Sequence, residues 1–233
     1  MGKDLMIPNR RLILPYAAPF LGYVFIASAF GDLLSLEVNY SLRIVVSTAL
    51  LVWAWRWYMP ISGPGSVYLS TGVGAVAGVL GAIIWIALLA PFVDVSANEP
   101  WSAGAFVLRV LAASLLVPVF EEILMRGFIF RLAWQWWEAR KQKISDPLQV
   151  ALDDKSVNDI PDGAWSWVAI LVSSLVFASG HHFYEWPAAM AFGVLMAVLW
   201  IICRDLLSCI VAHGITNLAL ALYVLQSNRW YLW

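Results

Sequence analysis

The strongest constraint on this chain is a series of apolar runs, each long enough to cross a lipid bilayer. A membrane-spanning helix needs about 20 mostly apolar residues. Inside lipid every backbone polar group needs a partner within the protein, so only helices and closed barrels span membranes, and these runs are too long for barrel strands. The sequence therefore predicts an all-α, polytopic transmembrane helix bundle of about seven helices, or eight with one re-entrant or surface helix. The runs lie at roughly 12–30, 42–58, 67–90, 106–134, 165–183, 187–203 and 206–225.

Composition and charge agree with a membrane protein and limit its partners. Of 233 residues, 62% are hydrophobic and only 12% are charged, whereas a soluble domain has about twice that charged share. The chain carries no basic tail and no nucleic-acid-binding motif, so we expect a lipid bilayer around it and no nucleic acid partner. A cytoplasmic N-terminus puts most lysines and arginines on the inner side, as membrane proteins prefer.

The chain is expected to form a single integral-membrane domain over residues 1–233. The one long hydrophilic stretch, about 138–164, is interpreted as a solvent loop with a short surface helix, and residues 91–100 as a polar loop. Gly74 and Gly78 in the third run form a GxxxG pair, and this spacing predicts close packing against another helix. Two cysteines, Cys203 and Cys209, give no disulfide framework and no metal-type spacing.

The fourth run carries two adjacent carboxylates, Glu121 and Glu122, and one guanidinium, Arg126. Charge inside a membrane is costly, so ionisable groups there mark candidate functional sites. On a helix, Glu122 and Arg126 share a face and are expected to pair, while Glu121 points about 100° away. Glu121 is thereby left free for chemistry. The alternative is that the cluster is a structural ion pair between two helices.

All three histidines of the chain also fall within apolar runs. His181 and His182 lie in the fifth run, and His213 lies in the seventh, four residues before Asn217 and on the same helix face. A single histidine there is more often an inter-helix hydrogen bond than a catalyst. All of them together with a glutamate pair favour one shared polar pocket between the fourth, fifth and seventh runs.

Such a pocket can hydrolyse an amide bond. Deprotonated Glu121 can take a proton from water, and His181 can hold that water and pass the proton to the leaving amine. His213 and Asn217 can donate hydrogen bonds to the developing oxyanion, which is a large contribution in a dry site. Which histidine of the 181–182 pair is active stays open. The predicted catalytic residues are Glu121, His181, His213 and Asn217, and the supporting residues are Glu122, Arg126 and His182.

These motifs resemble the CAAX-protease and bacteriocin-processing family of intramembrane proteases, which includes Rce1-type and Abi-like proteins. The resemblance covers roughly 106–222 and implies a catalytic core there. It also implies a glutamic-type intramembrane endopeptidase without a cofactor, acting on a peptide bond of a membrane-associated protein or peptide substrate. The run at 180–186 is similar to a bacterial branch associated with exosortase systems, which implies a bacterial inner membrane. The motifs are Glu121-Glu122-x-x-x-Arg126-Gly127, Phe177-x-x-x-His181 and His213-x-x-x-Asn217.

Three alternatives remain at this point. Glu121, His181 and His213 could bind zinc, because catalytic zinc usually has three protein ligands and a water. Cys209 lies four residues before His213, so a thiolate–imidazole pair is geometrically feasible, although it leaves the glutamates unexplained. A membrane transporter or a non-enzymatic scaffold is the third, since polar residues in spans also mark proton relays.

Overall fold

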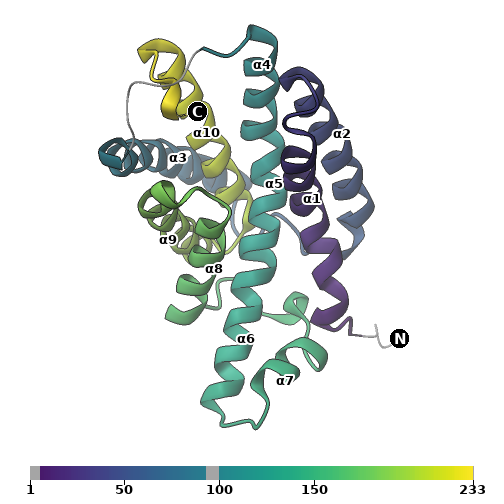
Figure 1. Ribbon diagram of the computed structural model, residues 1–233. Helices are drawn as coiled ribbons and strands as arrows, with labels where there is room; N and C mark the ends of the chain where they lie inside the picture. Colours follow the sequence, from purple (N-terminus) through teal and green to yellow (C-terminus); the bar gives the residue numbers. More distant parts are fainter. Residues whose placement is uncertain (1–5, 93–99, 233) are drawn as a thin grey trace.

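The computed structural model describes residues 6–92 and 100–232, and within them the chain is helical with no strand. Most of the predicted polar loop at 91–100 therefore lies outside the described residues. The all-helical bundle is confirmed (Figure 1). Its α-helices are α1 (Asn9–Phe30), α2 (Leu36–Ala54), α3 (Val67–Leu89), α4 (Ala103–Leu111), α5 (Val117–Glu122), α6 (Phe130–Lys141), α7 (Pro147–Asp153), α8 (Trp167–Ser179), α9 (Trp186–Cys203) and α10 (Leu206–Ser227).

Between these α-helices lie two π-helical segments, in which the turns of the helix are wider than normal, and several short 3-10 turns. Two segments with π-helical geometry, η3 (Ala112–Leu116) and η4 (Ile123–Ile129), join α4, α5 and α6 into one continuous helix of 39 residues. This long helix runs through the middle of the molecule, with α1 and α2 on one side and α3, α8, α9 and α10 on the other (Figure 1). The single-turn 3-10 segments are η1 (Trp55–Trp57), η2 (Ala90–Phe92), η5 (Val157–Asp159), η6 (Phe183–Glu185) and η7 (Trp230–Leu232).

Six helices among the described residues are long and apolar enough to cross a membrane. The run at 165–183, expected as a further span, forms the shorter apolar helix α8, which has only 13 residues. At 1.5 Å per residue its length is about 20 Å, against about 30 Å for the hydrocarbon layer. Gly180 caps α8, so the helix stops before His181 and a turn leads into η6. The chain is a multi-pass membrane protein.

A serine caps the start of α2 and of α4, and both helices begin earlier than their apolar runs suggested. The Ser35 hydroxyl accepts a hydrogen bond from the Val38 amide, and α2 therefore starts before residue 42. In the same way the Ser102 hydroxyl accepts from the Ala105 amide at the start of α4. Such side chains satisfy amides that have no partner within the first turn of a helix.

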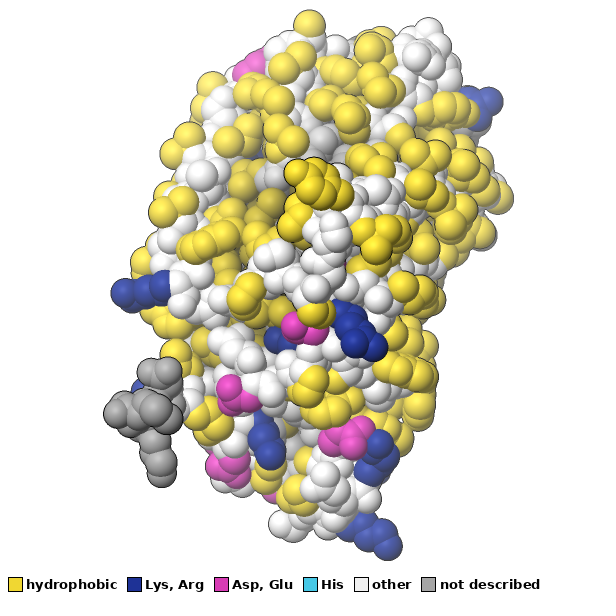
Figure 2. Space-filling model, turned by 180° about the vertical axis from the view of Figure 1, so that it is seen from behind, with side chains coloured by type: hydrophobic (Ala, Val, Ile, Leu, Met, Phe, Trp, Pro, Cys, Tyr) yellow, Lys and Arg dark blue, Asp and Glu magenta, His cyan; other side chains and the backbone are white. Residues whose placement is uncertain are grey.

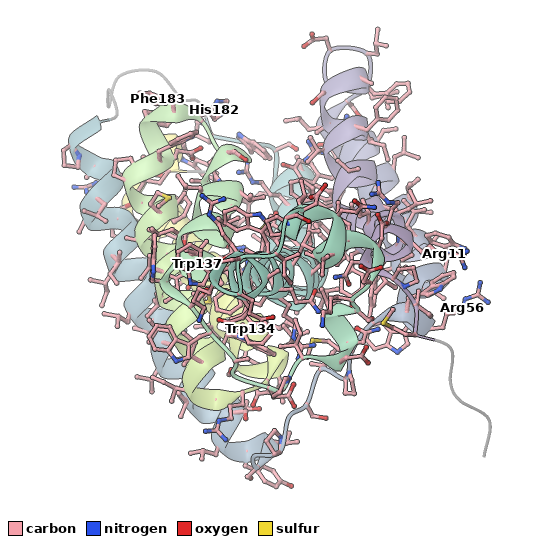
Figure 3. The ribbon with its side chains drawn as sticks, turned by 90° about the horizontal axis from the view of Figure 1, so that it is seen from below. Arg11, Arg56, Trp134, Trp137, His182 and Phe183 are labelled. Atoms are coloured by element: carbon pink, nitrogen blue, oxygen red, sulfur yellow. The ribbon has the colours of Figure 1, made fainter. Side chains whose placement is uncertain are left out.

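Charged side chains gather at the end of the bundle where α6 projects and α7 packs against it (Figures 1 and 2). The helix α7 is the expected surface helix, but α6 continues to residue 141, so the hydrophilic loop begins later than 138. Asn9 at the start of α1 donates a hydrogen bond to Gln135 of α6 at 2.6 Å. Seen from below, Arg11 and Arg56 lie together at the edge of this end (Figure 3). On the rest of the face in Figure 2, hydrophobic side chains are widespread and charged ones are few.

The glycines of α3 bring it into close contact with α10, as the GxxxG spacing predicted. A Cβ added to Gly78 would lie 2.6 Å from the carbonyl oxygen of Ala212, and one on Gly74 would lie 2.6 Å from that of Ser208. The Thr216 hydroxyl donates to the Gly78 carbonyl at 2.8 Å across this contact. Small residues let two membrane helices approach backbone to backbone. This contact fixes the position of α10, which carries His213.

Candidate active site

One cavity of about 180 Å³ lies between the long helix, α3, α8 and α10. All four residues predicted as catalytic line it: Glu121 from α5, His181 from the turn after α8, and His213 and Asn217 from α10. Phe177 and Phe192 contribute apolar walls. The fourth, fifth and seventh apolar runs therefore meet around a shared polar cavity, as the sequence predicted.

Beside this cavity, Glu122 and Arg126 form the expected ion pair. Both side chains are completely buried, and Arg126 Nη1 lies 3.0 Å from Glu122 Oε2. The same nitrogen donates to Oε1 at 3.2 Å, and Nη2 donates to the carbonyl of Gly193 in α9 at 2.8 Å. Because a guanidinium stays protonated in proteins, Glu122 is held as a carboxylate by this pairing.

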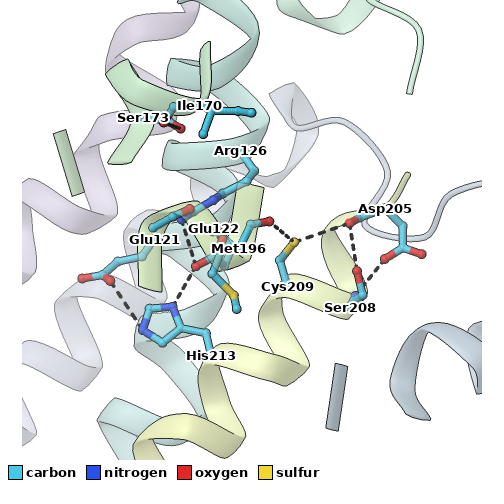
Figure 4. A network of polar contacts seen from close by, with 11 residues as sticks. Glu121, Glu122, Arg126, Ile170, Ser173, Met196, Asp205, Ser208, Cys209 and His213 are labelled. Atoms are coloured by element: carbon cyan, nitrogen blue, oxygen red, sulfur yellow. Dashed lines mark hydrogen bonds and ion pairs between the residues drawn. The ribbon is translucent and has the colours of Figure 1, made fainter. Parts of the chain in front are cut away.

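His213 lies between the two carboxylates (Figure 4). Its Nδ1 lies 2.8 Å from Glu122 Oε1, and its Nε2 lies 3.8 Å from Glu121 Oε2. An ionised Glu122 can only accept, so Nδ1 must carry the proton of the shorter contact. The imidazole therefore turns Nε2 toward Glu121 and the cavity. In a neutral imidazole, a proton on Nδ1 leaves Nε2 unprotonated and able to accept a hydrogen bond.

His181 is oriented by the last turn of α8. Its Nδ1 lies 3.0 Å from the carbonyl oxygen of Phe177, which can only accept, so Nδ1 is the donor. The imidazole packs against the rings of Phe177 at 4.8 Å and Trp85 at 5.4 Å between centroids. This arrangement leaves Nε2 of His181 as the nitrogen for chemistry in the cavity.

Asn217 is oriented by an irregularity of the long helix. In η3 the Val117 amide donates to the Ala112 carbonyl, five residues back, so it does not bond to Ala113. The next residue, Pro118, has no amide proton. The Ala113 carbonyl accepts a hydrogen bond from Asn217 Nδ2 at 2.7 Å instead. One N–H of the Asn217 amide is used in this bond and a second remains. Such π-helical segments within an α-helix are frequent at functional sites.

His182 does not reach the cavity. Its side chain is exposed and its ring stacks on Tyr184, with centroids 5.4 Å apart and planes 6° apart. Its backbone amide donates to Glu185 Oε2 at 2.8 Å, which caps η6. His182 and Phe183 lie at the edge of the molecule, away from the long helix (Figure 3). Of the two adjacent histidines, only His181 is in the predicted site.

Comparison with known families agrees with this geometry. A family model described as type II CAAX prenyl endopeptidase Rce1-like matches residues 103–219, just over half of the chain. The chain belongs to this Rce1-like family. The match begins at the first residue of α4 and contains all four predicted catalytic residues. No curated protein and no solved structure matches the chain significantly.

Family membership and the six candidate spans identify the chain as a multi-pass membrane protease of the CAAX endopeptidase type. The helices α1, α2 and α3 lie outside the matched residues, although Trp85 of α3 lines the cavity. The more specific assignment to the exosortase-associated branch stays a prediction.

The cavity of this Rce1-like protein has further lining residues that sequence reasoning missed. Four residues of the long helix, spaced four apart, line the cavity: Arg109, Ala113, Val117 and Glu121. This spacing along one helix face was a usable signal. Trp85, Glu185, Thr216 and Leu232 come from other elements, and nothing in the local sequence pointed to them.

A zinc site and a thiolate–imidazole pair are the other two arrangements that the sequence left open here. Within 6–92 and 100–232, no group of three or more His, Cys, Asp or Glu side chains is placed to hold a metal ion. Cys209 is buried beside the site, but its thiol contacts the carbonyl oxygens of Met196 at 3.5 Å and Asp205 at 3.9 Å (Figure 4). Cys209 does not line the cavity. The geometry therefore gives no support to a thiolate–imidazole pair with His213.

Proposed function

We propose that this protein is a glutamate-dependent intramembrane endopeptidase that hydrolyses a peptide bond of a membrane-associated protein or peptide. The observation that carries the proposal is the position of His213. It is tied to an ionised Glu122 through Nδ1 and faces Glu121 through Nε2, in a cavity that His181 and Asn217 also line. A base, a second proton carrier and hydrogen-bond donors thereby line one cavity.

In the first step, the Glu121 carboxylate takes a proton from a water that His181 Nε2 helps to hold. The water oxygen forms a bond to the carbonyl carbon of the substrate, and the carbonyl oxygen becomes an oxyanion. The second N–H of Asn217 donates to this oxyanion, as does His213 when Nε2 carries a proton. Donors placed in advance where charge develops lower the barrier, because they need no reorganisation during the reaction.

In the second step, the oxyanion reforms the carbonyl and the carbon–nitrogen bond breaks. The leaving amine takes the proton that Glu121 accepted, either directly or through His181. The products are a new carboxylic acid and a new amine, and Glu121 is again deprotonated. The acid then loses its remaining proton to the amine or to water and becomes a carboxylate. A carboxylate and an imidazole within reach of the same water are suited to this two-way proton transfer.

Glu122 and Arg126 are positioning residues in this proposal. Arg126 keeps Glu122 ionised, and Glu122 keeps His213 in the tautomer and orientation that turn Nε2 toward the reacting atoms. We further propose that no metal ion takes part. Both ring nitrogens of His213 already face carboxylates, and Asn217 is a natural oxyanion donor but a poor zinc ligand.

The orientation in the membrane is part of the same proposal. The end of the bundle formed by α7 and the start of α1 carries Arg11 and Arg56 and most of the charge in view (Figures 2 and 3). Because cytoplasmic loops are rich in lysine and arginine, we place this end and the N-terminus in the cytoplasm.

The test is cleavage of candidate membrane-peptide substrates by the purified protein in liposomes. Glu121→Gln keeps the size of the side chain but removes the base, and we expect it to lower turnover by about 10²–10⁴-fold. Glu138→Gln, a half-buried carboxylate near the end of α6 that does not line the cavity, is the matched control and should cleave at the wild-type rate. Cleavage by Glu121→Gln at the wild-type rate would refute the proposed role, and proton-coupled transport without cleavage would favour the transporter alternative.

A further inference from the structure

The helix α3 lies outside the residues that match the Rce1-like family, yet it contributes part of the wall of the active-site cavity. That part is the side chain of Trp85, which is buried with 9% of its surface exposed. The four residues predicted as catalytic, by contrast, all lie within the matched range. A large ring from outside the matched range therefore reaches the site of the proposed chemistry.

One face of α3 carries three glycines followed by a tryptophan: Gly74, Gly78, Gly81 and Trp85. Residues spaced three or four apart lie along one side of a helix. The glycines bring this side of α3 against α10 and α9, and a Cβ on Gly81 would lie 2.6 Å from the hydroxyl oxygen of Thr216 and 3.0 Å from the ring of Phe192. One turn later the same side of α3 reaches the cavity, and there it carries the tryptophan.

The Trp85 ring packs against two rings that come from other elements. Its centroid lies 5.4 Å from that of the His181 imidazole and 6.1 Å from that of the Phe192 ring. The Phe192 ring in turn lies 5.1 Å from the imidazole of His213. Aromatic rings at such separations prefer particular mutual angles, so each restricts how its neighbour turns. Trp85 and Phe192 thus link the two imidazoles of the site.

His181 depends on side-chain contacts because it does not lie on a helix. It follows the Gly180 cap of α8 and belongs to the turn that leads into η6. Phe177 of α8 provides a hydrogen bond to Nδ1 at 3.0 Å and a ring contact at 4.8 Å. Both of these contacts come from the helix that His181 follows. The Trp85 ring instead ties His181 to α3, which the glycines hold against α10.

We propose that Trp85 is a positioning residue of the active site: it holds the imidazole of His181 in a fixed place relative to His213 and Asn217 of α10. This inference rests on the proposed function, in which His181 holds the attacking water and carries a proton. Misplacing a reacting group by about 1 Å can cost about 10²-fold in rate. Loss of the Trp85 ring should therefore lower kcat much more than it changes KM.

The first experiment measures kcat and KM for peptide cleavage by full-length variants. Trp85→Leu removes the aromatic ring, and we expect kcat to fall by roughly 10- to 100-fold while KM stays within about threefold of wild type. Trp85→Phe keeps a ring beside His181 and should recover most of the lost rate. Leu89→Ala, one turn further along α3, removes a buried side chain that does not line the cavity, and as the control it should keep the wild-type kcat. A wild-type kcat in Trp85→Leu would overturn the proposal.

A double-mutant cycle separates positioning of His181 from a general effect on the fold. If Trp85 acts through His181, Trp85→Leu should lower the rate no further in a His181→Ala background, because the two side chains then contribute as one unit. Loss of the same factor in both backgrounds would show an effect independent of His181 and would overturn the proposal.

A third measurement does not depend on cleavage. The chain has only three histidines, so nitrogen NMR of histidine-labelled protein in liposomes can show which ring nitrogen of neutral His181 carries the proton, with His181→Ala identifying its signals. Wild type should show the proton on Nδ1, whereas Trp85→Leu should show a mixture, because the imidazole can turn away from the Phe177 carbonyl. Unchanged signals in Trp85→Leu would overturn the positioning role. If wild type cleaves no peptide but the signals change as expected, the proposed function fails and the role of Trp85 in orienting His181 stands.

Discussion

Glu122 accepts a hydrogen bond of 2.8 Å from Nδ1 of His213, ninety-one residues away in the sequence. The same carboxylate is paired with Arg126, and both of its partners are buried. The relationship joins α5 to α10 and sets the direction of the His213 ring. The Glu-Glu-x-x-x-Arg motif therefore has two separable parts, with Glu122 directed into this buried network and Glu121 directed into the cavity.

The buried pair can be tested by a double-mutant cycle. Glu122→Gln leaves the Arg126 guanidinium buried without a counter-charge, and breaking such a pair costs roughly 3–5 kcal/mol. We expect a clear loss of thermal stability from Glu122→Gln and from Arg126→Leu. The double substitution should recover part of the loss, because it removes both charges.

Single-turnover rates of the same variants separate the two carboxylates. Glu121→Gln should lose activity while keeping the wild-type melting temperature, whereas Glu122→Gln should lose both. A folded but inactive Glu122→Gln together with an active Glu121→Gln would exchange their roles. If both remained active, the cluster would be a structural ion pair only.

The two adjacent histidines are predicted to differ sharply. His181→Ala removes the imidazole from the cavity and should lower kcat by about 10²-fold or more, because a positioned proton carrier is lost. His182→Ala changes an exposed side chain that stacks on Tyr184, and it should keep wild-type kinetics. Equal losses from both substitutions would contradict the assignment of His181.

The close contact between α10 and the long helix at Gly214 can be tested by substitution. A Cβ on Gly214 would lie 2.5 Å from the carbonyl oxygen of Ser114 in η3, and a backbone atom cannot move aside cheaply. We expect Gly214→Ala to destabilise the protein by roughly 1–3 kcal/mol and to lower activity, since it displaces His213. Gly72→Ala meets nothing within 4 Å and is the matched control; it should be neutral or slightly stabilising.

The π-helical segment η3, which precedes Glu121 and Glu122, should affect the rate of catalysis more than the stability of the protein. Pro118→Ala introduces an amide proton five residues after Ala113, the same spacing as the bond from Val117 to Ala112, and the Ala113 carbonyl now accepts from Asn217. Competition for this acceptor should loosen Asn217 and lower kcat by roughly tenfold, with little change in melting temperature. If kcat were unchanged, the Ala113 contact would not be what orients Asn217.

The proposal that no metal ion takes part is tested with chelators on the purified protein. We expect cleavage to persist after exhaustive treatment with a zinc chelator and to show no gain when zinc is restored. Activity that disappears with the chelator and returns with zinc would establish the metalloprotease alternative, with Glu121, His181 and His213 as the first ligands to test by substitution.

The sequence went far toward this site because its signals are local or chemical. The four-residue spacing of Glu122 and Arg126 predicted their ion pair, and the spacing of Gly74 and Gly78 predicted a close helix contact, here with α10. The sequence overestimated the length of α8, because apolar composition alone does not show at which residue a helix ends. It also could not tell which of His181 and His182 enters the cavity, because that depends on the direction of the chain in the turn after α8.

By itself, the sequence determined that the chain is a helical membrane protein with its candidate catalytic side chains in three apolar segments. Lipid forces that outcome, since a backbone without water must bond within its own helix and buried charge is retained only with a partner. The tertiary structure decided that His213 lies between Glu121 and Glu122, that the carbonyl of Ala113 accepts a hydrogen bond from Asn217, and that Trp85 of α3 lines the cavity. These contacts join residues far apart in the chain, and their distances depend on how helices cross and where the long helix widens, which no local pattern of residues specifies.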